Sequence, residues 1–249
     1  MNFQKRKRFI FQELEKKGEL GIQQLADALQ TSTITVRRDL NLLAADGLLL
    51  RTHGGAMKVG ADEFPHRFNN KAAVHAKAKE QICRIAAGQI ADGDIIFMDC
   101  GSTVFHLCQF IKNKKIKVIT NSLPVISALQ ESQVSLNIIG GEFDAERQAI
   151  HGKKATDHIA SYRATKAFVG VDGISDRGLF SHSEKEASIT LAMAAQSAFT
   201  YLLCDESKIG KESYLKFAKP ELVNAIITDC PATKLKQLKK RKIAIIHTK

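Results

Sequence analysis

The chain has 249 residues, of which 44% are hydrophobic, and carries a formal net charge of +11 with a pI near 9.4. This length can form a small domain plus a medium one, with enough core to fold without disulfides. The five cysteines lack C-x-x-C spacing and are odd in number, so we expect no disulfide framework or structural zinc site. His106, His151, His158 and His182 share no metal-ligand spacing and read as ordinary packing or surface histidines, and we expect neither a metal nor a cofactor. No apolar run is long enough to cross a bilayer, and "MNFQKRKRF" lacks the apolar stretch of a secretion signal. We therefore predict a cytoplasmic protein without membrane contact.

The positive charge suits a polyanionic partner, because neutralising phosphates supplies most non-specific affinity for nucleic acids. Two basic runs, at 112–117 and 234–242, lie far from the segment that we interpret as a DNA reader. Basic runs of this kind are usually solvated surface, and we expect that role for both.

The first elements predicted along the chain are two helices. One has Phe3, Ile10 and Leu14 on a common side and ends at Gly18. A second, short apolar stripe lies in "GIQQLADAL", and the "QTS" that follows has room only for a tight turn. This arrangement predicts the first part of a helix-turn-helix.

A third helix follows from "STITVRRDLNLL", with Ser32 as its cap and Gly47 as its end. Val36, Leu40 and Leu43 recur with helical spacing and form its buried face.

The opposite arc of this helix carries Ile34, Arg37, Arg38 and Asn41. A solvated outer face is the alternative reading, and the short helix upstream favours DNA instead. Arg37 and Arg38 are expected to reach base edges or phosphates in the major groove. Thr33 and Thr35 are expected to contact the DNA backbone, and Asp39 to bond within the protein, because phosphate would repel a carboxylate.

Two extended segments around Thr52 to Gly55 in "LLLRTHGGAMKV" predict a hairpin, which would form the wing of a winged helix-turn-helix. The domain is assigned to residues 1–57, and the irregular stretch 58–70 to a linker. The residues expected to contact a double-stranded DNA operator are Ser32, Thr33, Thr35, Arg37, Arg38, Asn41, Arg51 and His53.

Residues 71–249 alternate between helical patterns, such as "STVFHLCQFI", and apolar strands, such as "KAFVGVDGI", which predicts an α/β domain with a mostly parallel sheet. Ligands bind such sheets at the carboxyl ends of the strands. Small and polar residues follow each predicted strand there, and together they suggest a pocket for a phosphorylated or polyhydroxylated molecule, although each cluster alone is ordinary turn chemistry. The expected effector residues are Asp99, Gly101, Ser102, Thr103, Thr120, Asn121, Ser122, Gly140, Gly141, Asp172, Gly173, Glu184, Asp205 and Lys208.

The ordered motifs "STITVRRDL", "GLLLRTHGGA", "IIFMDCGST", "VITNS", "IIGG", "FVGVDGI", "DESK" and "IITD" resemble the DeoR family of bacterial transcriptional regulators across nearly the whole chain. The resemblance implies a winged helix-turn-helix and a sensor domain similar to ribose-phosphate isomerases and coenzyme A transferases. It also implies a sugar-phosphate effector and a homo-oligomer, a dimer or tetramer. The family's effector motifs fall on Asp99 to Thr103, Thr120 to Ser122 and Asp205 to Lys208, with departures at Cys100, Ser102 and Glu206.

The predicted function is therefore a sequence-specific regulator, a repressor of sugar-metabolism genes that responds to a phosphorylated sugar, with no catalytic residues. The alternative is a sugar-phosphate isomerase-like enzyme that carries a DNA-binding module. Isomerase chemistry needs a positioned carboxylate base, and "VDGIS" offers only Asp172. The glycine-rich, lysine-bearing loop that the similar isomerases place next is not recognisable in "DRGLFSHSEKEA". A third reading, non-specific nucleoid or RNA binding, leaves the polar clusters unexplained.

Overall fold

The computed structural model describes residues 3–45, 49–52, 54–57, 68–241 and 243–248, which fall into two compact units, Met1–Ala73 and Val74–Lys249. Most of the predicted linker, Gly47 and His53 lie outside the described residues. Each unit is considered by itself below. Among the described residues, no helix is both long and apolar enough to traverse a bilayer.

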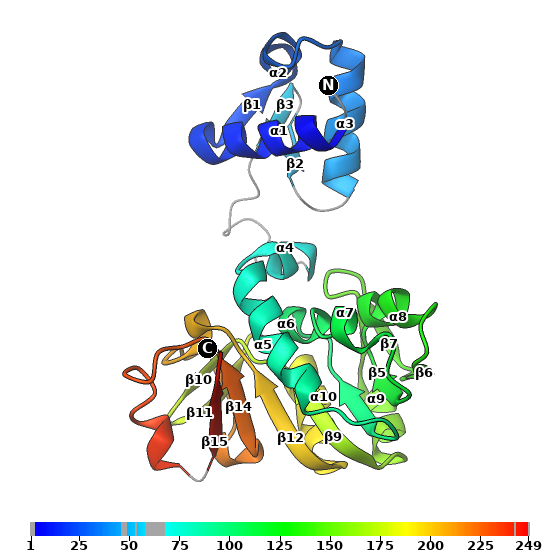
Figure 1. Ribbon diagram of the computed structural model, residues 1–249, viewed down its shortest axis with the longest axis vertical. Helices are drawn as coiled ribbons and strands as arrows, with labels where there is room; N and C mark the ends of the chain where they lie inside the picture. Colours follow the sequence, from blue (N-terminus) through cyan, green and yellow to red (C-terminus); the bar gives the residue numbers. More distant parts are fainter. Residues whose placement is uncertain (1–2, 46–48, 53, 58–67, 242, 249) are drawn as a thin grey trace. The chain divides into compact units, whose positions relative to one another are not determined.

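The first unit packs three helices against a small antiparallel sheet with strand order β1-β3-β2 (Figure 1). Its elements are α1 (Phe3–Lys17), β1 (Glu19–Gly21), α2 (Ile22–Ala28), α3 (Thr33–Ala45), β2 (Leu50–Arg51), β3 (Gly55–Met57) and α4 (Phe68–Ala73). The core contains the predicted apolar positions, including the fully buried Ile10, Val36, Leu40 and Leu43. The predicted cap is confirmed, because the backbone N–H of Thr35 donates to Ser32 Oγ at 3.2 Å.

Strand β1 was not predicted from the sequence. It is three residues long, which is too short for an alternating pattern, and it exists because β3 pairs with it, with Leu20 opposite Ala56. A side chain at Gly55 would come within 2.0 Å of the Leu20 carbonyl oxygen, so the close approach of these two strands requires glycine there.

The second unit is built on a seven-stranded parallel sheet with strand order β15-β14-β12-β9-β4-β5-β6, which confirms the predicted α/β class. The strands are β4 (Ile95–Met98), β5 (Lys117–Thr120), β6 (Ser135–Ile138), β9 (Ala164–Val169), β12 (Ser197–Leu203), β14 (Ala225–Thr228) and β15 (Ala244–His247). The helices are α5 (Ala76–Gly88), α6 (Ser102–Phe105), α7 (Cys108–Ile111), α8 (Leu123–Leu129), α9 (Lys153–Ala160), α10 (Glu184–Ala195) and the 3-10 turns η1 (Glu206–Lys208), η2 (Pro220–Leu222) and η3 (Leu238–Lys240).

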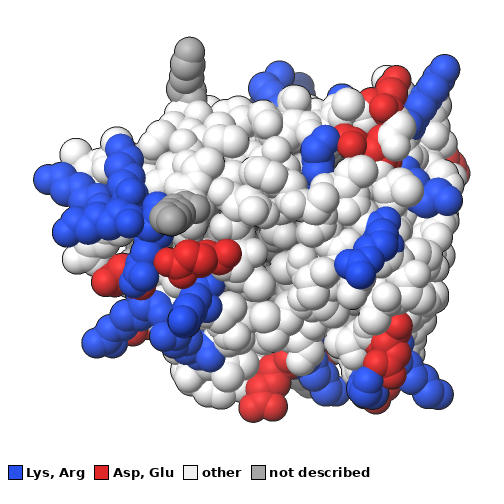
Figure 2. Space-filling model, turned by 90° about the horizontal axis from the view of Figure 1, so that it is seen from below, with Lys and Arg blue, Asp and Glu red and all other residues white. Residues whose placement is uncertain are grey.

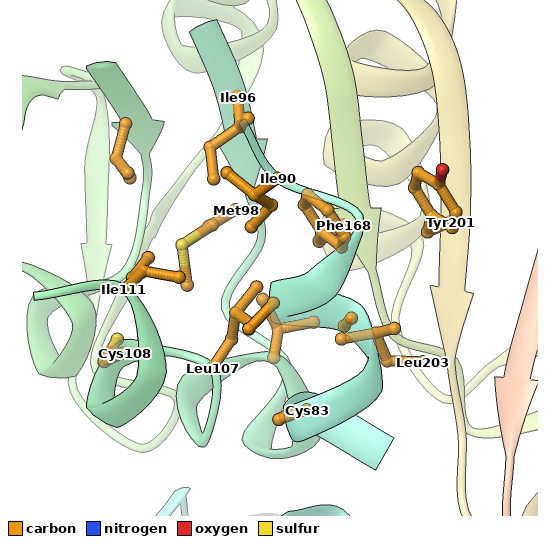
Figure 3. Packing of buried hydrophobic residues seen from close by; sticks show 14 of the residues in the cluster. Cys83, Ile90, Ile96, Met98, Leu107, Cys108, Ile111, Phe168, Tyr201 and Leu203 are labelled. Atoms are coloured by element: carbon orange, nitrogen blue, oxygen red, sulfur yellow. The ribbon is translucent and has the colours of Figure 1, made fainter. Parts of the chain in front are cut away.

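Alternate residues of the strands pack into two separate cores, one on each face of the sheet. Ile96 and Met98 of β4 point to the face covered by α5 to α8, together with Phe168 of β9 and Leu203 of β12 (Figure 3). Phe97, between them in sequence, packs on the other face with α9 and α10. Burial on both faces explains why these strands read as continuous apolar runs.

Two small antiparallel additions flank the large sheet. They are the hairpin β7 (Glu142–Asp144) and β8 (Ala149–His151), and the three-stranded group β10 (Gly173–Ser175), β11 (Gly178–Ser181) and β13 (Leu215–Ala218). The predicted strand "KAFVGVDGI" is therefore two strands in different sheets. The chain leaves the large sheet at Gly170, whose N–H is bound by the carboxylate of Asp99.

The predicted helix "STVFHLCQFI" is likewise divided, into α6 and α7. The N–H groups of His106 and Leu107 bond three residues back instead of four, to Thr103 and Val104, so the α-helical ladder stops there. This break carries no glycine or proline, which is why the residue pattern did not indicate it.

On the face shown in Figure 2, Lys and Arg side chains gather at one side of the molecule, with Asp and Glu side chains among them. In the basic segment 234–241, Lys234 pairs with Glu206 and Arg241 with Glu221, while Lys236 and Lys239 are exposed. This agrees with the expectation of a solvated surface for that run.

Candidate functional site

The outward face of α3 has the composition expected of a DNA reader. Ile34 is 77% exposed, and Arg37 and Arg38 are exposed as well. Within the described part of the chain, neither arginine has an ion-pair partner. Two unpaired guanidinium groups on one exposed helix face can donate to guanine edges or to phosphates without first breaking a bond within the protein.

Two neighbouring polar residues do bond within the unit. Asp39 is only 3% exposed and pairs with Arg6 of α1, which supports the prediction that it does not face DNA. Arg51 of β2 donates from Nε to Asn41 Oδ1 at 3.1 Å and also bonds the Gly55 carbonyl oxygen. Both residues were expected on DNA. The structure places them together, where Arg51 links the wing to the reading helix.

In the second unit, the centre of the sheet is a topological switch point. From β4 the chain runs outward through β5 and β6, and it then returns on the other side of β4 through β9, β12, β14 and β15. The loops after β4 and β9 therefore diverge at the same edge of the sheet, where open α/β sheets form their ligand crevice. The predicted polar clusters after β4, β5, β9 and β12 all follow carboxyl ends along this edge.

Asp99 joins the two loops that meet at the switch point. Its carboxylate accepts the N–H of Gly101 and the N–H of Gly170, each at 2.7 Å. Burial raises the pKa of Asp99 to about 6, and the charge of Glu186 also raises it, while the two backbone hydrogen bonds lower it. Because both carboxylate oxygens are engaged, the geometry gives Asp99 the role of positioning the loops.

A cation that sequence reasoning missed contacts the loop after β4. Lys79 of α5 is 3% exposed, and its Nζ donates to Ser102 Oγ at 3.1 Å. Cys83, one turn further along α5, donates from Sγ to the Thr103 carbonyl oxygen at 3.0 Å. The loop residues 101–103 thus lie against a buried ammonium group, which suits an anionic ligand.

The loop after β5 is fully buried and contains one unsatisfied polar atom. Thr120 Oγ1 accepts the N–H of Ser122, and Ser122 caps α8 by accepting the N–H of Val125. Asn121 donates from Nδ2 to the Ile150 carbonyl oxygen at 2.9 Å, but its Oδ1 is buried without a hydrogen-bond partner. An unsatisfied buried oxygen costs about 1 to 3 kcal/mol, so this atom is suited to receive a ligand donor.

The remaining predicted positions have mainly structural roles. Asp172 accepts the N–H of His182 at 2.9 Å, and Asp205 caps η1 by accepting the N–H of Ser207. A side chain at Gly173 would come within 2.2 Å of the Lys211 carbonyl oxygen, so Gly173 permits close packing. Lys208 ends η1, directly after these capped residues.

The glycine pair after β6 and the predicted Glu184 lie at the margin of the site. Gly140 donates its N–H to His158 Nδ1 at 3.1 Å. Gly141 has φ +155, and a side chain there would come within 2.5 Å of the His151 carbonyl oxygen. Glu184 is exposed at the start of α10, whereas Glu186, two residues later, is turned inward.

Three further residues at this edge were absent from the sequence-based site. Arg147, between β7 and β8, forms an ion pair with Glu186, and their side chains are 14% and 17% exposed. His151 is 1% exposed, and neither of its ring nitrogens has a hydrogen-bond partner among the residues that the structure describes. From the sequence, His151 reads as an ordinary packing or surface histidine. Only the fold shows that the β7–β8 hairpin lies beside α10 and the Asn121 loop.

The comparisons with known proteins cover both units. Residues 6–59 match the DeoR-like helix-turn-helix domain, and residues 74–230 match the DeoR C terminal sensor domain. The lactose phosphotransferase system repressor of Lactococcus lactis is 34% identical over 234 residues, 92% of each chain. The HTH-type transcriptional repressor GlcR of Bacillus subtilis is 28% identical over 87% of this chain and 84% of its own.

Among solved structures, ribose 5-phosphate isomerase A of Methanocaldococcus jannaschii is 17% identical and covers 53% of this chain and 54% of its own, with a TM-score of 0.40. The match to the sensor domain spans more than half of the chain, and the helix-turn-helix match covers most of the first unit. The chain belongs to the DeoR family of transcriptional regulators.

Proposed function

We propose that the protein is a sequence-specific repressor of sugar-metabolism genes, and that a phosphorylated sugar bound at the switch point of the sensor sheet controls its affinity for the operator. Membership of the family and the repressor names of the two relatives support the DNA-binding role. The exposed Arg37 and Arg38 supply the reading face.

The observation that carries the effector site is a set of buried polar groups with unmet hydrogen-bonding capacity. In the described part of the chain, Asn121 Oδ1 and both ring nitrogens of His151 have no hydrogen-bond partner. Natural cores rarely leave such atoms unsatisfied, and clusters of them mark sites that a polar ligand completes. The buried Lys79 beside Ser102 supplies a positive charge for a phosphate at the same edge.

The test uses the full chain. An operator duplex is first selected from a random-sequence library, and thermal stabilisation is then measured with a panel of sugar phosphates. We expect stabilisation by at least one phosphorylated sugar and none by its unphosphorylated counterpart. The same compound should change operator affinity about 5-fold to 150-fold, the usual range of coupling between two sites. Stabilisation without any change in operator affinity would contradict the proposed control.

An isomerase that carries a DNA-binding module is the second candidate. Asp172 is the acid available for proton transfer, and its carboxylate is bound by the N–H of His182 and by Ser181, which restricts it as a base. We therefore propose a sensor without turnover. Conversion of ribose 5-phosphate or an amino-sugar phosphate at enzymatic rates, lost in Asp172→Asn, would reverse this ranking.

A further inference from the structure

The ion pair between Arg147 and Glu186 joins two elements that are distant in sequence. Arg147 comes from the turn of the β7–β8 hairpin, and Glu186 from the first turn of α10. The β7–β8 hairpin is held to the loop after β5 by the hydrogen bond from Asn121 Nδ2 to the Ile150 carbonyl oxygen, and the segment before α10 is held to the loop after β9 by the bond from the His182 N–H to Asp172. The pair therefore lies at the same edge of the sheet as the loop 101–103, where the proposed function puts the phosphate, and its charges act on Asp99 and Asp172.

The charges around this pair are unfavourable for a second anion on the ligand. Among the described residues, the carboxylates of Asp99, Asp172 and Glu186 lie around the guanidinium of Arg147. Asp144 and Lys185, which act on the neighbouring His151, carry opposite charges. Burial lowers the pKa of Arg147, but the charges of Glu186 and other neighbours together with the hydrogen bond to Glu186 raise it above its ordinary value, so the guanidinium stays charged and is neutralised within the protein. A second phosphate or a carboxylate here would meet excess negative charge where solvent screening is weak.

Uncharged hydroxyl groups fit the same surroundings well. Glu186 and Asn121 Oδ1 can accept hydrogen bonds, and Arg147 can donate them. The buried ring of His151 has two unpartnered nitrogens, and burial lowers its pKa, so the neutral ring offers one donor and one acceptor. A hydroxyl group is itself both donor and acceptor, and it can satisfy these atoms without adding charge.

We infer that Arg147 and Glu186 determine the class of effector, which is a sugar monophosphate whose remaining groups are uncharged hydroxyls, and that they exclude sugar bisphosphates and phosphorylated sugar acids. This inference rests on the proposed function. It adds that the phosphate lies toward Lys79 and Ser102, and that the Glu186 carboxylate selects against a second negative charge at the other end.

The experiment compares matched ligand pairs on the full chain by isothermal titration. Fructose 6-phosphate is paired with fructose 1,6-bisphosphate, and glucose 6-phosphate with 6-phosphogluconate. In the wild type, we expect the monophosphate that binds to be preferred over its doubly charged counterpart by at least about tenfold, which corresponds to about 1.4 kcal/mol. Equal or tighter binding of the doubly charged counterpart would overturn the inference.

Two variants test the pair in opposite directions. Glu186→Gln removes the repelling charge and leaves Arg147 to attract an anion, so the preference should shrink at least about fivefold. Arg147→Gln leaves the carboxylates without their cation, so the preference should grow. The control is Glu131→Gln, because Glu131 is exposed after the end of α8 that lies opposite Ser122 and should leave the preference unchanged. A preference that both inner variants leave unchanged contradicts the assignment.

Circular dichroism establishes that each variant is folded, and either variant alone is sufficient for the test. If the wild type binds no sugar phosphate of a wider panel, the proposed function fails. If it binds monophosphates and bisphosphates alike, only the present inference fails.

Discussion

Arg6 and Asp39 form a bidentate ion pair that connects α1 to the reading helix α3. Arg6 Nε lies 2.5 Å from Asp39 Oδ2, and its Nη2 lies 3.0 Å from Oδ1. The Asp39 side chain is 4% exposed and that of Arg6 14%, so solvent screens this pair weakly. Asp39 is adjacent to Arg38 in sequence, and the pair therefore sets how α3 presents its arginines.

Removing the negative partner should destabilise the first unit. Asp39→Asn leaves the Arg6 guanidinium without its counter-charge, and breaking a buried pair in this way costs about 3 kcal/mol. The control is Glu13→Gln on the same helix as Arg6, because within the described residues Glu13 pairs with the exposed Lys16 and Lys17 and its loss should change stability little. Urea unfolding of the full chain, followed by amide NMR signals of α1 and α3, measures both. An equal decrease in the free energy of unfolding for Asp39→Asn and Glu13→Gln would contradict the prediction that the buried pair contributes more than the exposed one.

The reading face predicts distinct losses of DNA affinity. If Arg37 or Arg38 makes a bidentate contact to guanine, its replacement by Ala should cost about 1 to 3 kcal/mol and relax preference at one base position. If it contacts only phosphate, affinity should fall equally for all sequences, with a weaker salt dependence. Fluorescence anisotropy with operator and mutated duplexes distinguishes the two results. Lys17→Ala, at the exposed end of α1, is the matched control, and normal binding by the folded double mutant would refute the assignment.

The loop after β4 predicts a variant that binds DNA but responds poorly to the effector. Ser102→Ala removes the hydroxyl that Lys79 contacts, and losing a hydrogen bond to a charged group costs about 1.5 kcal/mol, or about tenfold in effector affinity. Operator affinity without effector should stay unchanged. Gly101 is a poorer target, because a side chain there would come within 2.8 Å of Asp99 Oδ1 and disturb the loop itself.

Ser188→Ala provides the comparison for Ser102→Ala, since Ser188 is exposed on α10 and bonds only the Glu184 carbonyl oxygen among the described residues. Operator release is titrated with the effector found by screening. A Ser102→Ala variant with the same response as the wild type would place the phosphate elsewhere.

The pKa of Asp99 predicts a pH dependence with a definite sign. Its value in the folded protein is about 6, above that of an unfolded aspartate, so the folded state binds this proton more tightly. Protonated Asp99 therefore stabilises the folded state below about pH 4. As the pH rises from there to about 6, this stabilisation is lost and the free energy of unfolding falls by about 3 kcal/mol. The carboxyl carbon of Asp99, assigned by its absence in Asp99→Asn, should titrate in 13C NMR with a midpoint near pH 6. A midpoint below pH 4 would contradict the burial argument.

Assembly gives a further prediction. One winged helix makes few base contacts, and oligomeric regulators repeat that contact over paired operator half-sites. We expect a dimer or tetramer in light scattering of the full chain. A monomer both in solution and on an operator with two half-sites would be the contrary result.

The sequence alone determined the local features. Helical spacing of Val36, Leu40 and Leu43 identified the reading helix and its buried face, and Ser32 identified its start, because caps and periodicity act within a few residues. Continuous apolar runs identified the parallel strands for the same reason. Polar residues after those strands indicated which edge of the sheet holds the site.

The tertiary structure decided how separate segments meet. The pair Arg147–Glu186, the contact of Lys79 with Ser102 and the unpartnered ring of His151 each depend on elements brought together by the order of strands around β4 and β9. Nothing in the local pattern of "DAERQAIHG" distinguishes a hairpin turn with exposed charges from one whose arginine is largely buried in an ion pair with a distant helix. Burial and partner choice there are set by long-range packing, which single-chain periodicity does not encode.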